Sequence, residues 1–511
     1  MDGNKEHSKQ GIERARVVGH FSQGGGGAGG GWPPLVTGLL AHAGRNYLSF
    51  HVPGHKQGAG AWRPWRALLG EEVFRLDLTE LPGLDNLQAP EGIIRAAASD
   101  AARAFGSQET FFLVNGTTAG ILAMLLATCG PGDRVLVPRA CHQAVIHGLI
   151  LTGASPVYLP VRAHPAWGLP GALETEELER ALDSEAAGGR AAVFLHPNYY
   201  GLTGALEIQI QKVQARGFLA LVDEAHGTHF CAGTSYPVPA LRAGADLVAQ
   251  GAHKVLGAFT QAAFLHHRGT LPDPGKLQQA LRIVQSSSPS YLLLASLDVA
   301  RHQFCREKEK WEEVASLGME LRYRVSQIPG LFAPGEELKE VPGVVSFDPA
   351  RLIVNVRGLG ITGFGAAAWL RRERRIQVEL ADFQNILFIL SPADSGLVPD
   401  LLAGLGALAR AVDFGREWQA STYPEPPDLP LPRQLMTPRE AFFAPQREAP
   451  LAAARGKVAA EVVAPYPPGV PLICPGEEIN PEALAYLAAW QEAGGVWPGR
   501  KKGTVKIVAG S

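Results

Sequence analysis

The chain has 511 residues, 46% of them hydrophobic, and a formal net charge of −2. At about 150 residues per domain, this length predicts about three domains, and the apolar content suffices for a large buried core. The near-neutral charge gives no reason to expect nucleic acid or an anionic membrane as a partner.

Cysteine usage and the apolar runs favour a cytoplasmic protein. The five cysteines lie far apart with no C-x-x-C pair, which predicts neither a disulfide framework nor a zinc site. No apolar run is long enough to span a bilayer without interruption by charge or glycine. The charged residues from Asp2 to Lys9 lead into no apolar stretch of the kind found in a signal peptide.

The N-terminal part predicts a tail and an arm. Residues 1–31 end in the glycine runs Gly24–Gly27 and Gly29–Gly31, which bury little surface, so we expect a flexible tail. Residues 32–75 form an N-terminal arm that contains Phe50-His51-Val52-Pro53-Gly54-His55-Lys56.

Residues 76–310 show short apolar runs that alternate with helical stretches. Expected strands are Arg134–Val137, Ala191–Leu195, Phe218–Val222, Asp246–Ala249 and Ala262–Leu265. Expected helices between them include Ala119–Thr128 and Cys141–Leu151. This alternation predicts a large α/β domain with a mostly parallel sheet, covered on both faces, that binds ligands at the carboxyl ends of its strands.

The rest of the chain predicts two smaller units. Trp311–Ile328 has the pattern of a long amphipathic helix and leads into a smaller α+β domain over residues 311–422. A proline-rich linker, Tyr423–Pro432, then separates a C-terminal domain over residues 433–511.

The first motif with chemical meaning is Asn115-Gly116-Thr117-Thr118-Ala119-Gly120, which precedes an apolar helix. Unpaired backbone N–H groups and the positive helix end make such a start a natural phosphate cradle. The hydroxyl groups of Thr117 and Thr118 add two donors. The alternative is an ordinary helix N-cap followed by a turn glycine.

The second motif is Val222-Asp223-Glu224-Ala225-His226-Gly227. Asp223 follows an apolar strand, so its carboxylate lies at a strand carboxyl end and could keep a pyridine nitrogen protonated. The alternative is a helix N-cap aspartate. His226 and His229 could join Asp223 around a metal, but the spacing implies no further ligand, so we expect no metal site.

The third motif is Gln250-Gly251-Ala252-His253-Lys254-Val255-Leu256-Gly257. Lys254 follows the next strand and lies among small and apolar residues, which can lower its pKa and make it a nucleophile. The alternative is a surface lysine in a loop.

The three motifs together are more specific than any one of them. A phosphate cradle, a carboxylate and a lysine all fall at strand ends. Pyridoxal 5′-phosphate (PLP) needs these contacts: a phosphate anchor, a partner for the pyridinium nitrogen and a lysine that forms a Schiff base. We therefore expect an enzyme of the aspartate-aminotransferase-like fold (PLP fold type I) that uses PLP.

The sequence resembles the ornithine/lysine/arginine decarboxylases of this fold, most of all the short bacterial arginine decarboxylases. The resemblance runs from about Pro34 to beyond Gly476. Its marks are the arm motif Phe50–Lys56, the motif Asp223–Gly227, His253-Lys254, the run Ser288–Asp298, and Tyr466-Pro467-Pro468-Gly469.

The resemblance implies a role for each matching residue. Lys254 would form the Schiff base, Asp223 would pair with the pyridine nitrogen, and His142 would stack on the ring. The further cofactor contacts that it implies are Thr117, Thr118, Ala225, His226 and His253. Ser287 would reach a phosphate across the interface of a homodimer or a higher homo-oligomer.

The implied reaction is decarboxylation of a basic amino acid, most of all arginine to agmatine and CO₂, with lysine or ornithine as alternatives, in polyamine biosynthesis. His253 or Lys254 would protonate Cα. Candidate carboxylates for the cationic side chain are Glu80, Asp85, Glu379 and Asp382; for each, the alternative is a solvated surface carboxylate.

Two positions depart from the family pattern. Relatives usually have serine three residues before the lysine, where this chain has Gly251, and often have His-Lys-Ser where it has His142-Gln143-Ala144. Glycine at 251 removes a hydroxyl donor near the phosphate, or it is present because the backbone there needs a positive φ.

Two other functions remain open. One is another PLP reaction on the same fold, transamination or aldol cleavage. An aminotransferase usually binds the carboxylate of a second acid through an arginine, for which Arg351, Arg357 or the cluster Arg371–Arg375 could serve. The other is a non-catalytic paralogue that acts as a binding or regulatory subunit.

Overall fold

The computed structural model describes residues 31–184, 188–413, 430–465, 469–492 and 503–511. All but the last position of the expected tail lies outside these residues. So do the linker up to residue 429 and Tyr466–Pro468 of the last family motif.

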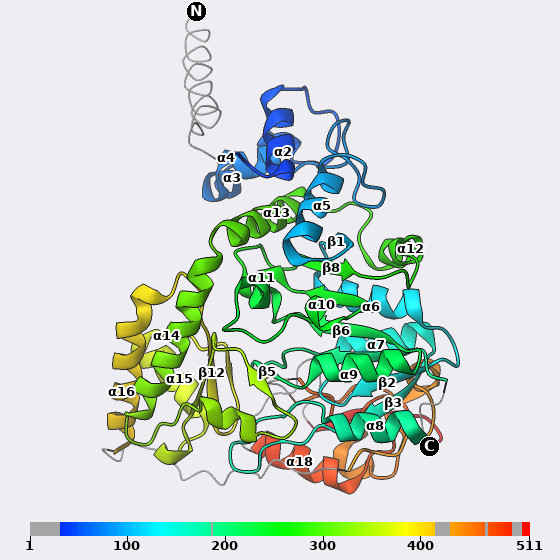
Figure 1. Cartoon of the computed structure of the whole chain (residues 1–511), viewed down its shortest axis with the longest axis vertical. Coiled ribbons are helices and arrows are strands. Elements are labelled where there is room, and N and C mark those ends of the chain that lie inside the picture. The colour runs from blue at the N-terminus through cyan, green and yellow to red at the C-terminus, as the bar shows by residue number, and fades with distance from the viewer. Residues whose placement is uncertain (1–30, 185–187, 414–429, 466–468, 493–502) are drawn as a thin grey trace, which may run out of the picture.

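A seven-stranded sheet forms the centre of the chain (Figure 1). In sheet order the strands are β1 (Glu109–Leu113), β8 (Ala263–His267), β7 (Leu247–Gln250), β6 (Leu219–Glu224), β4 (Ala191–Leu195), β2 (Arg134–Pro138) and β3 (Ser155–Leu159). The last five strands in this order are parallel, and β8 is antiparallel to both of its neighbours. All five expected strands are confirmed, and β1 and β3 are additional.

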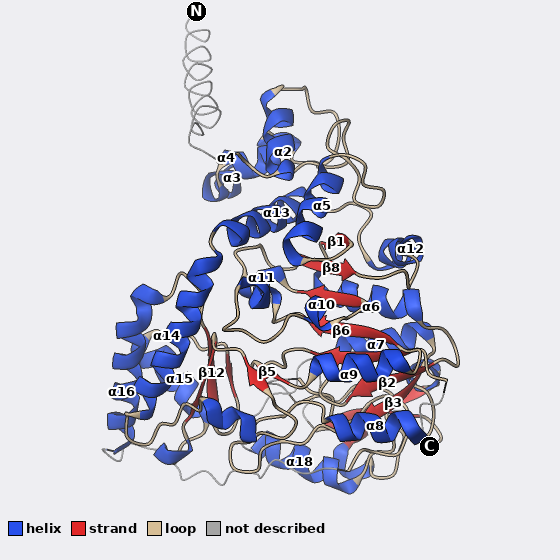
Figure 2. Ribbon diagram, viewed as in Figure 1, coloured by secondary structure: helices blue, strands red, loops and turns tan. Residues whose placement is uncertain are grey.

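Helices cover both faces of the sheet, as expected (Figure 2). One face packs on α6 (Gly116–Thr128), α7 (Gln143–Thr152) and α12 (Pro274–Val284). The other packs on α5 (Ile93–Phe105), α8 (Thr175–Ser184), α9 (Leu206–Ala215), α10 (Ala240–Ala243) and α13 (Tyr291–Arg306). In β6, Leu219 and Leu221 enter the first core and Ala220 and Val222 the second. Because both faces are buried, the strands read as continuous apolar runs.

The smaller α+β unit begins with α14 (Lys308–Ser326), which confirms the expected amphipathic helix. An antiparallel sheet of β10 (Arg351–Asn355), β12 (Asn385–Ile389) and β11 (Leu380–Ala381) follows, with α15 (Gly363–Arg374) and α16 (Val398–Asp413) beside it. A two-stranded pairing of β5 (Leu202–Thr203) with β9 (Ser346–Phe347) joins this unit to the large one. Among the described residues, only Ser395–Val412 is long and apolar enough to cross a membrane; its helix packs on α14 and α15.

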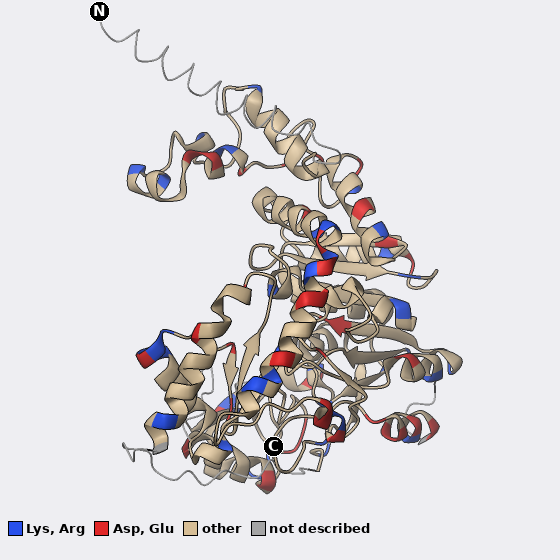
Figure 3. Cartoon of the chain, turned by 60° about the vertical axis from the view of Figure 1, so that its left-hand side comes forward, with Lys and Arg blue, Asp and Glu red and all other residues tan. Residues whose placement is uncertain are grey.

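The N-terminal arm lies at the top of the molecule in Figure 1 and packs on α5 and α13 (Figures 1 and 3). It contains α2 (Pro34–Gly44), η1 (Lys56–Gly58), α3 (Arg63–Leu69) and α4 (Glu71–Leu76). Phe50 is 90% exposed, and the other large exposed apolar side chains of the arm include Leu48, Val52, Trp62 and Leu68. The backbone N–H of Leu35 donates to Asp298 on α13 at 3.1 Å and so fixes the start of α2.

A buried ion pair joins the C-terminal segment to the sheet. This segment contains α17 (Pro438–Phe443), β13 (Gln446–Pro450), α18 (Pro481–Glu492) and β14 (Thr504–Val508). Arg139, directly after β2, donates two hydrogen bonds of 2.7 Å to the carboxylate of Glu477. Arg139 Nη2 also donates to the Leu472 carbonyl at 2.8 Å, and the Glu477 carboxylate accepts the Cys474 N–H at 2.6 Å. The bidentate geometry satisfies both charges away from water.

Replacing Glu477 by alanine should therefore lower the free energy of unfolding by about 3–5 kcal/mol, because it leaves the Arg139 guanidinium buried without its counter-charge. Urea unfolding followed by circular dichroism measures the loss. The matched control is Glu320→Ala, which removes a partner of Arg324 from an exposed pair and should leave stability unchanged. Equal stability of the two variants would contradict this role of the Arg139–Glu477 pair.

Candidate active site

The carboxyl ends of the parallel strands open into a cavity of about 360 Å³. All three motifs line it, although they are far apart in the sequence: Asn115–Thr118, Asp223 with Ala225 and His226, and His253 with Lys254. Further lining residues are Cys141, His142, Pro170, Tyr199, Gln261, Gly469 and Val470.

The Asp223 carboxylate is fixed by the sheet register. Asp223 lies inside β6, where it pairs with Leu195 of β4 and Ala249 of β7, so the alternative of a helix N-cap is wrong. Its side chain is buried, and Oδ1 accepts the N–H of Ala225 at 3.1 Å. A carboxylate held in this way at the cavity wall can bind a cationic ring nitrogen.

Lys254 belongs to a short helix, α11 (Ala252–Val255), and is partly buried, so the alternative of a surface lysine in a loop is wrong. Its Nζ lies 2.9 Å from Nε2 of His226. Burial and the charge of Arg351 lower the pKa of Lys254, while the carboxylates of Asp223 and Glu379 act in the opposite direction. A depressed pKa increases the fraction of free amine, which is the nucleophilic form.

His226 lies between Lys254 and a buried arginine. Its Nδ1 is 3.0 Å from Nη2 of Arg351, and its ring centroid is 4.6 Å from that of Tyr199. Burial, together with the charges of Lys254 and Arg351, holds the pKa of His226 well below its usual value of 6.5. His226 is therefore neutral at physiological pH.

The start of α6 has the features of an anion site. Asn115 occupies the N-cap position, but its side chain makes no capping hydrogen bond and instead accepts the N–H of Ser286 at 3.2 Å. The ordinary N-cap alternative is thus wrong for the side chain. Gly116 has φ +73°, which favours glycine, and the first turn carries no acidic residue. Thr117 and Thr118 follow in this turn and line the cavity.

Two further histidines face the cavity. His142 is the N-cap of α7, and its Nδ1 accepts the N–H of Ala144 at 3.1 Å, which orients the exposed ring. The expected helix over Cys141–Leu151 therefore begins two residues later, at Gln143. The Nδ1 of His253 lies 3.0 Å from the carbonyl oxygen of Ala262.

The conformation of Gly251 shows that the positive-φ explanation is wrong, because its φ is −91°. The position is instead crowded. A Cβ atom there would lie 2.6 Å from the carbonyl oxygen of Ala225 and 3.3 Å from Cδ of Lys254. Glycine therefore lets the start of α11 approach the chain that follows β6.

The four candidate substrate carboxylates do not line the cavity of the single chain. Asp85 accepts the backbone N–H groups of Glu91, Gly92, Ile94 and Arg95 around the start of α5, and Asp382 accepts the Tyr200 hydroxyl and lines a separate cavity. Glu80 accepts from the Thr79 hydroxyl. Glu379 comes nearest, since it accepts the hydroxyl of Tyr199, a lining residue, at 2.6 Å.

The remaining predicted residues lie as follows. Ser287 is exposed in a loop that reaches Asn115 through the N–H of its neighbour Ser286. Among the arginines considered for a second carboxylate, Arg351 is fully buried and does not line the cavity, and the cluster Arg371–Arg375 is exposed. Tyr199 and the link from Arg351 to His226 were not expected, since no motif marks them.

Comparison with known proteins gives consistent matches over most of the chain. The model of the Orn/Lys/Arg decarboxylase major domain matches residues 33–396, and the model of the C-terminal domain of the same family matches residues 420–506. The arginine decarboxylase of Bacillus subtilis (strain 168) is 37% identical over 477 residues, which are 93% of this chain and 97% of the relative. The arginine decarboxylase of Halalkalibacterium halodurans is 36% identical over a stretch that covers 90% of this chain and 94% of the relative's length.

A solved structure supports the fold. Lysine decarboxylase A from Pseudomonas aeruginosa superposes with a TM-score of 0.79 and 22% identity, over 98% of this chain and 82% of that chain.

Replacing Gly251 by alanine should lower stability by about 1–3 kcal/mol, because the added Cβ meets the backbone of Ala225. The side chain of serine has the same Cβ, so Gly251→Ser should lose stability by a similar amount. Gly251→Ser should therefore not retain the cofactor better than the parent protein. Thermal melting of the cofactor-free protein measures the effect. At Gly257 a Cβ would lie 3.6 Å from Gln303, an ordinary contact, so Gly257→Ala is the control. An unchanged melting temperature for Gly251→Ala would contradict the prediction, because it would mean that the Ala225 carbonyl can move away from the added Cβ without loss of stability.

Proposed function

Because this chain belongs to the Orn/Lys/Arg decarboxylase family, we propose that it removes the α-carboxyl group of a basic amino acid as CO₂, with PLP as its cofactor. The observation that carries this proposal is the convergence of Lys254, Asp223 and the start of α6 on one cavity. Arginine is the favoured substrate, because relatives named arginine decarboxylase are 35–37% identical, whereas named lysine and ornithine decarboxylases are 26% identical.

The residues present fit PLP by their chemistry. A lysine whose pKa is lowered by burial suits covalent attachment to an aldehyde carbon, and a buried carboxylate suits a pyridinium nitrogen. The start of α6 offers N–H groups and two threonine hydroxyls to a phosphate. When bound, PLP supplies an electron sink for the electron pair that remains on Cα as CO₂ leaves.

The side chains of the cavity then have distinct tasks. Lys254 would hold the cofactor through its amine, and Asp223 would keep the ring nitrogen protonated. His142 would contact the cofactor ring, since it lines the same cavity. After CO₂ leaves, His253 or Lys254 delivers a proton to Cα, since both face the cavity. Ala225 and His226 complete the wall beside Asp223.

For the cationic end of the substrate we propose Glu379, through its contact with Tyr199. The carboxylates of Asp85 and Asp382 are already bound to donors of their own subunit. The family membership and the buried position of Arg351 favour decarboxylation over transamination. A non-catalytic role is disfavoured because Lys254, Asp223 and His142 all face one cavity.

The proposal includes a homodimer as the smallest active unit, in the cytoplasm. The apolar side chains exposed on the arm, Phe50 above all, suit burial against a second copy. Ser287 would then reach the phosphate of the neighbouring site. The five cysteines are free, as suits a reducing compartment.

The direct test is CO₂ release from arginine, lysine and ornithine, assayed in parallel. Release should be fastest from arginine. Lys254→Ala should lower it by at least about a thousandfold and abolish the visible absorbance of lysine-bound cofactor, because no other lysine of the described residues lines this cavity. Near-normal turnover by Lys254→Ala would refute the assignment, and formation of a keto acid without CO₂ would indicate an aminotransferase.

The shared site is tested by mixing Lys254→Ala with Ser287→Ala, each of which should lower activity by itself. In a hybrid dimer both lesions fall in one site and leave the other intact, so mixing should restore up to about a quarter of the parent activity if subunits exchange at random. Mixing Lys254→Ala with Asp223→Asn is the control, since both residues belong to one subunit's cavity and no intact site can form. Hybrids that form without restoring activity would rule out a shared site.

A further inference from the structure

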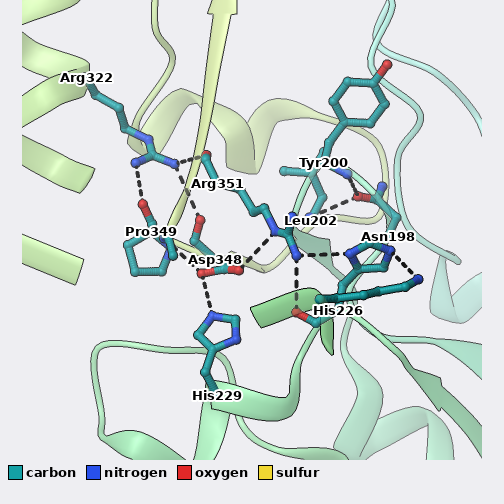
Figure 4. Close-up of polar contacts among 11 residues, drawn as sticks. Asn198, Tyr200, Leu202, His226, His229, Arg322, Asp348, Pro349 and Arg351 are labelled. Carbon is teal, nitrogen blue, oxygen red and sulfur yellow. Dashed lines mark hydrogen bonds and ion pairs between the residues drawn. The ribbon is translucent and has the colours of Figure 1, made fainter. Parts of the chain in front are cut away.

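A series of buried groups connects the smaller unit to Lys254, and Figure 4 labels its members from Arg322 to His226. It begins at Arg322 on α14, which donates to the carbonyl oxygens of Pro349 at 2.9 Å and of Arg351 at 2.6 Å. These bonds fix the backbone that leads into β10. The backbone turns at Asp348, three positions before Arg351, and the Asp348 carboxylate is fully buried.

Arg351 and Asp348 form the middle of the series. Asp348 Oδ1 accepts from Nε2 of His229 at 3.1 Å, and Oδ2 lies 3.5 Å from Nε of Arg351. Burial alone would raise the pKa of Asp348, but His229 and Arg351 hold it below its usual value. The carboxylate is therefore ionised and fixes the Arg351 guanidinium, whose Nη2 is 3.0 Å from Nδ1 of His226.

The donor properties of arginine dictate the state of the histidine. A guanidinium has five N–H donors, no acceptor, and remains protonated in proteins even where burial lowers its pKa, as it does for Arg351. Nδ1 of His226 must therefore accept, so it carries no hydrogen. A neutral imidazole then has its hydrogen on Nε2, and Nε2 can only donate.

The atom that faces Nε2 is Nζ of Lys254, at 2.9 Å. An ammonium group has three donors and no acceptor, whereas a neutral amine has a lone pair that accepts. A donor-to-donor contact at this distance would be repulsive. We infer that Arg351 fixes His226 as the Nε2–H tautomer, and that His226 thereby holds the unbound side chain of Lys254 as a neutral amine. Arg351 and His226 are positioning residues for the nucleophile.

The other charges around Lys254 do not favour the ammonium form strongly enough to reverse this preference for the neutral amine. The titratable groups that face it are Asp223, Glu379, Arg351, His142, His226 and His253. The two carboxylates favour the ammonium form. Burial and Arg351 oppose them and prevail, since the pKa of Lys254 lies below its usual value. Burial likewise lowers the pKa of both His142 and His253, so neither histidine adds a charge at neutral pH.

The inference is tested on the cofactor-free full-length protein by competitive labelling of Lys254 with a trace of acetic anhydride, read by mass spectrometry from pH 6 to 11. Arg351→Met keeps the bulk and removes the charge and the donors. It should raise the pH midpoint of Lys254 labelling by about one unit, because the positive charge that disfavours the ammonium form is gone. Below the midpoint, Lys254 should then be labelled about tenfold more slowly. The control is Arg301→Met, another buried arginine, which pairs with Asp298 on α13 and should leave the midpoint unchanged. A merely structural role for Arg351 would lower the melting temperature without moving the midpoint, and that result would overturn the inference.

Two variants of His226 keep the test decisive if Arg351→Met does not fold. Glutamine can accept from Arg351 and donate to Lys254, so His226→Gln should keep the midpoint close to that of the parent, whereas His226→Ala should raise it. Equal midpoints for the two variants would refute the role of the histidine.

The tautomer itself is visible by ¹⁵N NMR of histidine-labelled protein, in which His226 is assigned by its absence from His226→Gln. Nδ1 should be unprotonated, and a protonated Nδ1 would overturn the inference. Although the inference rests on the proposed role of Lys254, neither readout requires turnover. A protein without decarboxylase activity could still pass both tests, so the two proposals can fail separately.

Discussion

Parallel pairing of β4, β6 and β7 determines where the reactive groups lie. Asp223 pairs with Leu195 on one side and Ala249 on the other, so the chain leaves β6 and β7 at the same edge of the sheet. A shift of one residue in either register would turn Asp223 away from the cavity, because successive side chains of a strand point to opposite faces. Burial of both sheet faces stabilises this register, and the apolar cores on the two faces therefore also fix the geometry of the site.

The second constraint is the cost of burying charge. Asp223, Asp348 and Arg351 are buried and Lys254 is partly buried, and an unpaired buried charge is costly. Asp348 forms an ion pair with Arg351, Arg351 donates to His226, and Nε2 of His226 faces the Lys254 side chain. Because Arg351 belongs to β10, a movement of the smaller unit relative to the large sheet would change the environment of the lysine.

The sequence predicted the elements whose signals are local. Apolar runs located five strands of the sheet within one or two residues, and the position of each motif after a strand brought Asp223, Lys254 and Asn115–Thr118 correctly to one cavity. β1 and β3 were missed because their apolar runs are short: Glu109–Leu113 begins with two polar residues, and Ser155–Leu159 begins with serine and proline. The antiparallel direction of β8 depends on the connection through Leu256–Gln261, which has no periodic pattern.

Contacts between distant segments were beyond the sequence. The sequence Asp348-Pro349-Ala350-Arg351 contains no pattern that predicts the contact of Arg351 with His226, which lies 125 positions before Arg351 in the chain. The explanation of Gly251 by a positive φ was wrong because a glycine can serve either conformation or close approach, and only the distance to the Ala225 carbonyl separates the two. Glu80 and Asp85 illustrate the same limit, since their spacing does not reveal that Asp85 is occupied by the backbone of α5.

The central claim is that Lys254 is the residue that carries PLP. The most direct measurement is borohydride reduction of the protein purified with its cofactor, which makes the lysine–cofactor bond permanent, followed by digestion and mass spectrometry. The account predicts one modified lysine, in the peptide that contains His253 and Lys254, with the mass of the reduced cofactor. Modification of another lysine, or a protein that takes up PLP without any reducible bond, would contradict it.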